Sequence, residues 1–440
     1  MKRHYIIDAV RISLSLIILY KCTHYLLNHF NYFQNHLSFI LYPSLISTIF
    51  LMCGYQIRIC SLLLIFMVSS YEIYVEIFNL GTAISNILLL FFVLSHNKMR
   101  FKDEKVSYPT LIVHPLIIAF IICATVNFSA GILHLTDPYW QKGSALSLIL
   151  KNSYYTNNYD FFEHLKNHHQ MFFESTTKML SRIQIILQLI MLPIAFIKYG
   201  FLIIRCWGII FSLLSIVFFQ ISLLPYFYLS FWILTFYLPY NYKFELPFFR
   251  TSLGFKKFVA FYFLLLLFTE SSLSQFLKHK KISNKQLVNT SYEKLLKENK
   301  TEEYITLISK YFGLTNPNVF NSQDIQSNSK WVVIYNISNS QRKLIPFINE
   351  DGSRLSYHSN DIIYYRDSIP IRRSLLANDL NQTMSHLIQI SAYDYREHTN
   401  SRDNIYEFVF YEKHDSISPR NDNQSNNPVY SRRIDINPFL

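Results

Sequence analysis

The feature that most constrains the fold is a series of long apolar stretches in the first 273 residues. A helix of about 20 apolar residues can cross the hydrocarbon core of a bilayer. Half of the chain is hydrophobic and only 16% is charged, a balance that argues against a soluble enzyme. We therefore predict an α-helical polytopic membrane protein with about nine transmembrane helices, at 5–25, 37–56, 59–77, 82–97, 110–135, 183–202, 204–223, 225–240 and 257–273.

The positions of Lys and Arg predict the orientation, because basic loops are retained on the cytoplasmic side. With the predicted spans, the basic segments all fall on one face, whereas the alternating connections 24–36, 78–82 and 222–226 contain neither Lys nor Arg. We expect a plasma-membrane protein with a cytoplasmic amino terminus. The basic segments are Lys2–Arg3, Arg58, 97–105, 198–205 and 243–257.

The composition changes after residue 273, where polar residues dominate and apolar residues occur in short alternating runs. We divide the chain into a transmembrane helical domain at 1–273, a small α+β extracytoplasmic domain at 274–412 and a polar, peripheral tail at 413–440. In the middle region the pattern predicts helices near 283–311 and 376–391 and strands at 330–337, 343–348, 361–366 and 405–412.

Ionisable residues inside a span are costly and are the first candidates for function. Arg11 lies near the start of the first span and can either reach the cytoplasmic interface or pair with a carboxylate. Glu72 lies in the third span, where it can serve a proton relay or form a salt bridge to Arg or Lys. Both alternatives remain open for each residue.

The segment 124–143 has the densest set of candidate site residues. Asn127, Ala130, Gly131 and His134 recur at steps of three and four, so they share one stripe of a helix. The stripe combines an amide, two small residues that permit close helix contact, and an imidazole. His134 can act as a base or proton shuttle, because histidine titrates near neutral pH, or it can be a hydrogen-bonded residue at a helix end.

The same span ends at Asp137, and Trp140 follows at the expected membrane interface, where amphipathic rings concentrate. We predict a cavity near the outer surface, lined by Asn127, Glu72, Asp137 and Trp140, with His134 as the candidate catalytic group.

A histidine pair, His164 and His168, is one helical turn apart and is the weak candidate for a metal site. No third ligand is identifiable, so no metal is predicted. The alternative is an interfacial amphipathic helix with Phe161, Phe162, Phe172 and Phe173 toward lipid. The sequence contains no glycine-rich phosphate loop, no nucleophile elbow and no basic-aromatic face, so we expect no nucleic-acid partner.

Three segments resemble the HTTM membrane family, which includes the vitamin K-dependent gamma-glutamyl carboxylases. They are RISLSLIILY from Arg11, GYQIR from Gly54 to Arg58, and NFSAGILHLTDPYWQKGSAL around Ala130, Gly131 and Gly143. The downstream run KLIPFINEDGSRLSYHSNDIIYYRDSIPIRR is similar to the polar domain that follows the spans in bacterial members.

The resemblance implies a quinone cofactor and a peptide or protein substrate. Carboxylases of the family couple quinone oxidation to proton removal from a glutamate, using a Lys in the motif AGxKKL. Here Leu133-His134 stands at that pair, and the reference pKa of histidine, about 6.5, lies far below the value of about 10.4 for lysine. Two functions follow as expectations: modification or maturation of a peptide or protein at the outer face, or a non-enzymatic scaffold, immunity or export-accessory role.

Overall fold

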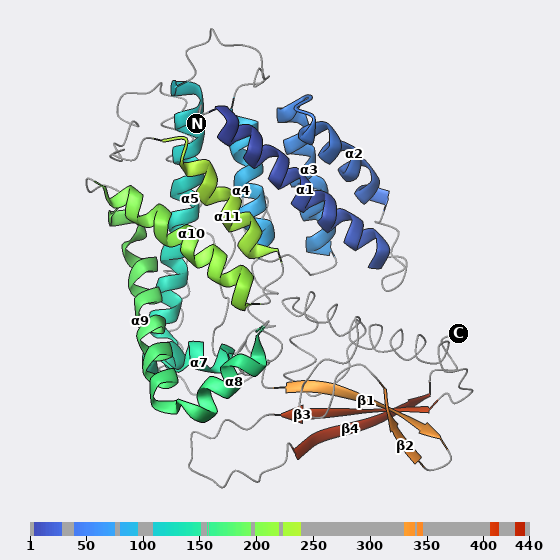
Figure 1. Ribbon diagram of the computed structural model, residues 1–440. Coiled ribbons are helices and arrows are strands. Elements are labelled where there is room, and N and C mark those ends of the chain that lie inside the picture. Colours follow the sequence, from blue (N-terminus) through green and yellow to red (C-terminus); the bar gives the residue numbers. More distant parts are fainter. Residues whose placement is uncertain are drawn as a thin grey trace, which may run out of the picture.

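The computed structural model describes residues 4–28, 39–74, 80–95, 109–150, 156, 158–194, 199–219, 223–238, 330–338, 341–345, 405–412 and 427–435 (Figure 1). Most of these residues are helical. The helices are α1 (His4–Asn28), α2 (Leu41–Met52), α3 (Ile57–Tyr74), α4 (Leu80–Leu94), α5 (Pro109–Thr136), α6 (Pro138–Lys142), α7 (Ala145–Leu150), α8 (Tyr159–His168), α9 (Gln170–Ile194), α10 (Gly200–Phe218) and α11 (Leu224–Thr235).

Two segments of the described helices are long and apolar enough to cross a membrane, Val113–Leu135 in α5 and Gly200–Phe218, which is α10. Shorter apolar helices are α2, α4 and α11. Eight of the apolar stretches found in the sequence coincide at least in part with described helices, and the stretch 257–273 lies outside the described residues. The total of about nine spans stays a prediction.

The largest difference from the expected boundaries is at α9, which begins at Gln170 rather than near 183. Glu174, Lys178 and Arg182 interrupt the apolar pattern, but they are four residues apart and all exposed. They therefore occupy one face of a helix whose opposite side is packed. The helix therefore begins about three and a half turns before the apolar stretch does.

The helices pack around α4, which is buried without interruption from Gly81 to Phe92. It contacts α3, α5 and α11, while α1 contacts α2 and α11. Beside this group, α5 runs along α9, and α7 and α8 contact the amino-terminal part of α9 (Figure 1). The consequence is a continuous apolar core in which any polar side chain needs a protein partner.

One close helix contact depends on the absence of a side chain. A Cβ atom built on Gly208 of α10 would lie 2.1 Å from the Trp232 ring of α11. Glycine at this position lets the indole pack directly against the α10 backbone.

The described strands form one antiparallel sheet in the order β2-β1-β3-β4. Its central pair aligns Ile334 with Phe408, and a bulge between Phe410 and Tyr411 interrupts the β3–β4 register. The strand expected at 361–366 and the helices expected at 283–311 and 376–391 lie outside the described residues. The strands are β1 (Lys330–Ser338), β2 (Gln341–Leu344), β3 (Ile405–Glu412) and β4 (Asn427–Asp435).

The fourth strand lies within the segment 413–440, which sequence analysis interpreted as a polar, peripheral tail. Residues Asn427–Asp435 pair along β3 over nearly the whole length of that strand. This strand contains Pro428, Arg432 and Arg433, which obscure the alternation of apolar residues expected of a strand. Residues 427–435 therefore form one edge of the sheet.

Candidate functional site

A buried ion pair between α1 and α3 is the centre of the candidate site. The Lys21 ammonium contacts Glu72 Oε1, and the two side chains are 3% and 0% exposed. Lys21 Nζ also donates to Thr82 Oγ1 of α4 at 2.7 Å. Thr82 in turn donates to Glu72 Oε2, and the Tyr25 hydroxyl donates to Glu72 Oε1 at 2.5 Å. Three helices thus contribute the Glu72 carboxylate and the three polar groups around it, and we call Lys21, Tyr25, Glu72 and Thr82 the Lys-Glu centre.

Aromatic rings enclose the Lys-Glu centre. Lys21 Nζ lies 5.8 Å from the Tyr25 ring centroid and 5.7 Å from that of Phe227 on α11. The Tyr25 and Tyr71 rings lie 5.4 Å apart. Rings at these distances favour the cation electrostatically while they exclude water. The pair is therefore strongly coupled, because little solvent screens the charges.

A second buried polar contact joins α5 to α11. Asn127 Nδ2 of α5 donates to the Tyr228 hydroxyl at 2.8 Å and to the Cys123 carbonyl at 2.8 Å. Tyr228 follows Phe227, whose ring lies 5.7 Å from Lys21 Nζ, so consecutive residues of α11 contact the two polar groups. The amide of Asn127 is thus already hydrogen-bonded.

His134 belongs to a different corner, formed by α5, α6 and α9. Its Nδ1 lies 3.0 Å from Gln188 Oε1, and its ring stacks on Trp140 at 3.9 Å between centroids. Asp137 caps α6 and accepts from the Tyr139 backbone at 2.9 Å. A carbonyl-type oxygen only accepts, so Nδ1 of His134 carries the proton when it bonds to Gln188.

The small residues predicted near His134 bring α9 close to α5. A Cβ atom built on Gly131 would lie 3.1 Å from both Gln188 and Leu189, so glycine permits the approach that brings Gln188 to His134. Ala130 is buried in the same helix. Gly143 ends α6 in the left-handed conformation, with φ of 76°.

The predicted cavity residues therefore have separate sets of partners. Glu72 lies in the Lys-Glu centre and Asn127 bonds to Tyr228 of α11, whereas His134, Asp137 and Trp140 lie at the α5–α6–α9 corner. Seven residues separate Asn127 from His134, a rise of about 10 Å along α5. Their hydrogen-bond partners come from different helices, α11 and α9.

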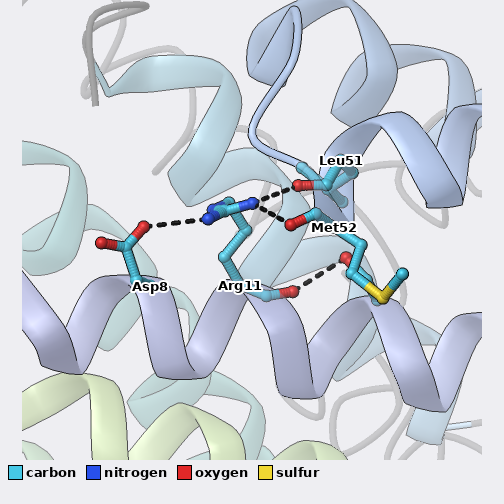
Figure 2. A network of polar contacts seen from close by, with 5 residues as sticks. Asp8, Arg11, Leu51 and Met52 are labelled. Carbon is cyan, nitrogen blue, oxygen red and sulfur yellow. Dashed lines mark hydrogen bonds and ion pairs between the residues drawn. The ribbon is translucent and has the colours of Figure 1, made fainter. Parts of the chain in front are cut away.

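Arg11 is buried and holds the end of the next helix (Figure 2). Its Nη1 donates to the Leu51 carbonyl at 2.6 Å and also to the Met52 carbonyl, and its Nη2 pairs with Asp8 at 3.0 Å. The last carbonyls of a helix have no partner within it, and a cation there also complements the helix dipole. Of the two alternatives for Arg11, the structure contains the carboxylate pair together with a helix cap.

Gly54, just beyond the end of α2, lies against this guanidinium. Its φ is 74°, and a Cβ atom would lie 3.2 Å from Arg11 Nη1. Glycine is required here both by backbone conformation and by space. Arg11 and Gly54, which the sequence placed in separate segments of the HTTM-like pattern, are in contact.

Two other arginines repeat the arrangement. Arg58 Nε of α3 donates to the Ser95 carbonyl at the end of α4 at 2.6 Å. Arg205 Nη1 of α10 donates to the Leu238 carbonyl, just beyond α11, at 3.2 Å. In each case an arginine near the start of one helix caps the end of the helix that follows. We call the contacts of Arg11, Arg58 and Arg205 the arginine clasps.

The histidines of α8 are at the surface. His164 and His168 are both exposed, with ring centroids 4.0 Å apart. Within the described part of the chain no group of three or more His, Cys, Asp or Glu side chains is arranged to hold a metal. Phe161 is exposed as expected for an interfacial helix, but Phe162 is buried against Phe218, so its predicted lipid contact is corrected.

Phe172 and Phe173 of α9 divide in the same way. Phe172 is exposed, whereas Phe173 is only 2% exposed and packs in the cluster of Leu150 and Phe162. Adjacent helical residues point about 100° apart, and here Phe173 turns into the core while Phe172 stays exposed. The expectation that Phe173 faces lipid is corrected too.

Sequence reasoning did not single out the partners of these groups, namely Lys21, Tyr25, Thr82, Gln188 and Tyr228. One available signal was Lys21 itself, a second cation deep in the first span, since a charge at that depth needs a counter-charge.

No family model matches the sequence, and neither the curated proteins nor the solved structures give a significant match.

Proposed function

We propose that this chain is a polytopic plasma-membrane protein that modifies or matures a peptide or protein substrate at its extracytoplasmic side, using the Lys-Glu centre for proton transfer. The buried ion pair of Lys21 with Glu72 carries the proposal. The amino terminus is cytoplasmic, and residues 274–412 are extracytoplasmic.

The distribution of polar residues supports the proposal that the helices are embedded in a bilayer. In α2, Ser44, Ser47 and Thr48 are buried while Ile46 and Ile49 are exposed. A helix on the surface of a water-soluble protein has the opposite arrangement, with its apolar face inward. Small and hydroxylated residues inside and aliphatic residues outside are typical of helices packed together in lipid.

The same inversion occurs in α10. Gly208, Ser212 and Ser215 are buried, whereas Leu213 and Val217 are exposed. This helix is also one of the two long enough to span. In water, the exposed aliphatic face of α10 would form an extensive apolar patch. In a bilayer, the same face contacts lipid and needs no protein partner.

The arginine clasps support the orientation. Arg11, Arg58 and Arg205 each lie in the first helix of a hairpin, namely α1–α2, α3–α4 and α10–α11. In the proposed topology the first helix of each hairpin begins on the cytoplasmic side, so all three arginines lie toward the cytoplasm. Lys21 follows Arg11 by ten residues, or about 15 Å along α1. The Lys-Glu centre then lies toward the extracytoplasmic half of the bundle.

The chemistry of the Lys-Glu centre suits proton transfer. Glu72 accepts from an ammonium, a phenol and a hydroxyl, so a proton can move among groups already in hydrogen-bond contact. An ion pair at membrane depth is costly and is a site hypothesis by default. In the HTTM-like version of the proposal, a quinone is the cofactor, and Lys21 supplies the amine that Leu133-His134 does not.

The test uses protein purified with native lipids and analysed by mass spectrometry for co-purifying peptides and quinones. Glu72→Gln keeps the size of the side chain and its acceptor oxygen but removes the charge. We expect wild type to carry a covalently altered peptide and Glu72→Gln to carry the unaltered one. The matched control is Asn86→Leu, which breaks a 2.8 Å contact with Ser69 in the same bundle and removes no charge. An altered peptide in both variants contradicts the enzyme proposal.

The second candidate is a scaffold, immunity or export-accessory protein. It is favoured by the hydrogen bonds that already engage Glu72, Asn127 and His134, which fit structural roles as well. The partner would bind through the described sheet, whose strand β2 is exposed at Gln341 and Lys343. Co-purification of an unmodified protein partner, lost in Lys343→Asp and kept in Glu72→Gln, is the expected result for this role.

A further inference from the structure

The α8 histidine pair has a geometry that the proposed function does not use. His164 and His168 follow each other by one turn, both are exposed, and their rings lie 4.0 Å apart with a tilt of 30°. We propose that this pair binds a divalent transition-metal cation. Two imidazoles at this spacing can both reach one ion after small ring rotations, because metal–nitrogen bonds are about 2.0–2.1 Å long.

The hydrogen bonding of His168 prepares it as a ligand. Its Nδ1 lies 3.0 Å from the His164 backbone carbonyl. A carbonyl oxygen can only accept, so Nδ1 carries the proton and the lone pair resides on Nε2. Metal-bound histidines commonly donate their second ring nitrogen in this way, which fixes both the tautomer and the ring orientation.

The packing of α8 turns the pair away from the protein. Phe162 is buried against Phe173 and Phe218, and this contact fixes the rotation of the helix. His164 and His168 lie about 200° and 240° around the axis from Phe162, so they are on the opposite, exposed face. The pair is therefore accessible to an ion from solution without any rearrangement of the core.

The two imidazole ligands determine which cations the pair prefers. Imidazole nitrogen suits copper, nickel and zinc, and affinity for such sites rises toward Cu²⁺. The part of the chain that the structure describes supplies no third ligand at this position, so water or an external donor completes the coordination. We expect an exchangeable surface ion, bound independently of the Lys-Glu centre.

The experiment titrates the full-length, tag-free protein in detergent with CuCl₂ and follows the bound ion by electron paramagnetic resonance. We expect one site with hyperfine structure from two imidazole nitrogens. His164→Ala and His168→Ala should each weaken binding about tenfold or more and remove one nitrogen from the spectrum, as expected when a ligand is lost.

His169→Ala is the matched control, because His169 is also exposed and adjacent in sequence but is not stacked with the pair. Its affinity and spectrum should equal those of wild type. The proposal is overturned if wild type shows no two-nitrogen site, if the double variant His164→Ala/His168→Ala keeps it, or if His169→Ala abolishes it. All three positions are at the surface, so loss of folding does not confound the comparison.

Discussion

Replacing Arg11 tests whether the arginine clasp stabilises the bundle. The guanidinium is 2% exposed and makes two hydrogen bonds to the end of α2 and one ion pair with Asp8. Hydrogen bonds to charged groups contribute about 1.5–3 kcal/mol each. Because Arg11→Met also leaves Asp8 without this partner, we expect the free energy of unfolding to fall by about 3–5 kcal/mol.

The assay is reversible unfolding in mixed micelles with increasing SDS, monitored by circular dichroism. Arg182→Met is the matched control, because Arg182 is exposed on α9, and its loss should change stability by less than about 0.5 kcal/mol. Arg11→Lys should be intermediate, since one ammonium lacks the planar fork that serves several acceptors at once. An Arg11→Met protein as stable as Arg182→Met refutes the reasoning.

Other contacts make further predictions in the same assay. Gly208→Ala places a methyl group within 2.1 Å of the Trp232 ring and should destabilise the α10–α11 contact by about 1–3 kcal/mol. A Gly208→Ala protein as stable as wild type would contradict this prediction. Tyr228→Phe removes the hydroxyl that accepts from Asn127 and should cost about 1–3 kcal/mol. Tyr226→Phe, at a 44% exposed position, is its control and should be close to neutral, and equal effects would refute the role assigned to the buried hydroxyl.

The helical pattern was largely accessible from the sequence, because apolar composition over about 20 residues is a strong signal. The prediction was incomplete where one face of a helix is charged, because the average composition of such a segment is no longer apolar. Glu174, Lys178 and Arg182 mark one exposed face of α9, and the sequence analysis therefore began the apolar span only after them, at 183. Strand β4 was missed for a related reason, since its pairing with β3 compensates for a weak local pattern.

The site was accessible only in part. A charge such as Glu72 inside a span predicts a partner, and the sequence analysis named a salt bridge to Arg or Lys as one alternative. It could not select Lys21, because that choice depends on which faces of α1 and α3 meet. The partners of Arg11 are harder still to predict. The Leu51 and Met52 carbonyls are backbone groups, which every residue has and which therefore leave no signature in the sequence.

The Lys-Glu centre is tested most directly by comparing single and paired removal of its charges. Lys21→Met or Glu72→Leu alone leaves a buried charge and should destabilise the protein by about 3–5 kcal/mol, whereas the paired variant should recover most of that loss. The decisive measurement is mass spectrometry of the peptides that co-purify with the double variant Lys21→Met/Glu72→Leu, whose stability is expected to be close to that of wild type. We predict unaltered peptide from the paired variant and altered peptide from wild type. Altered peptide from both would contradict a role for the Lys-Glu centre in the chemistry.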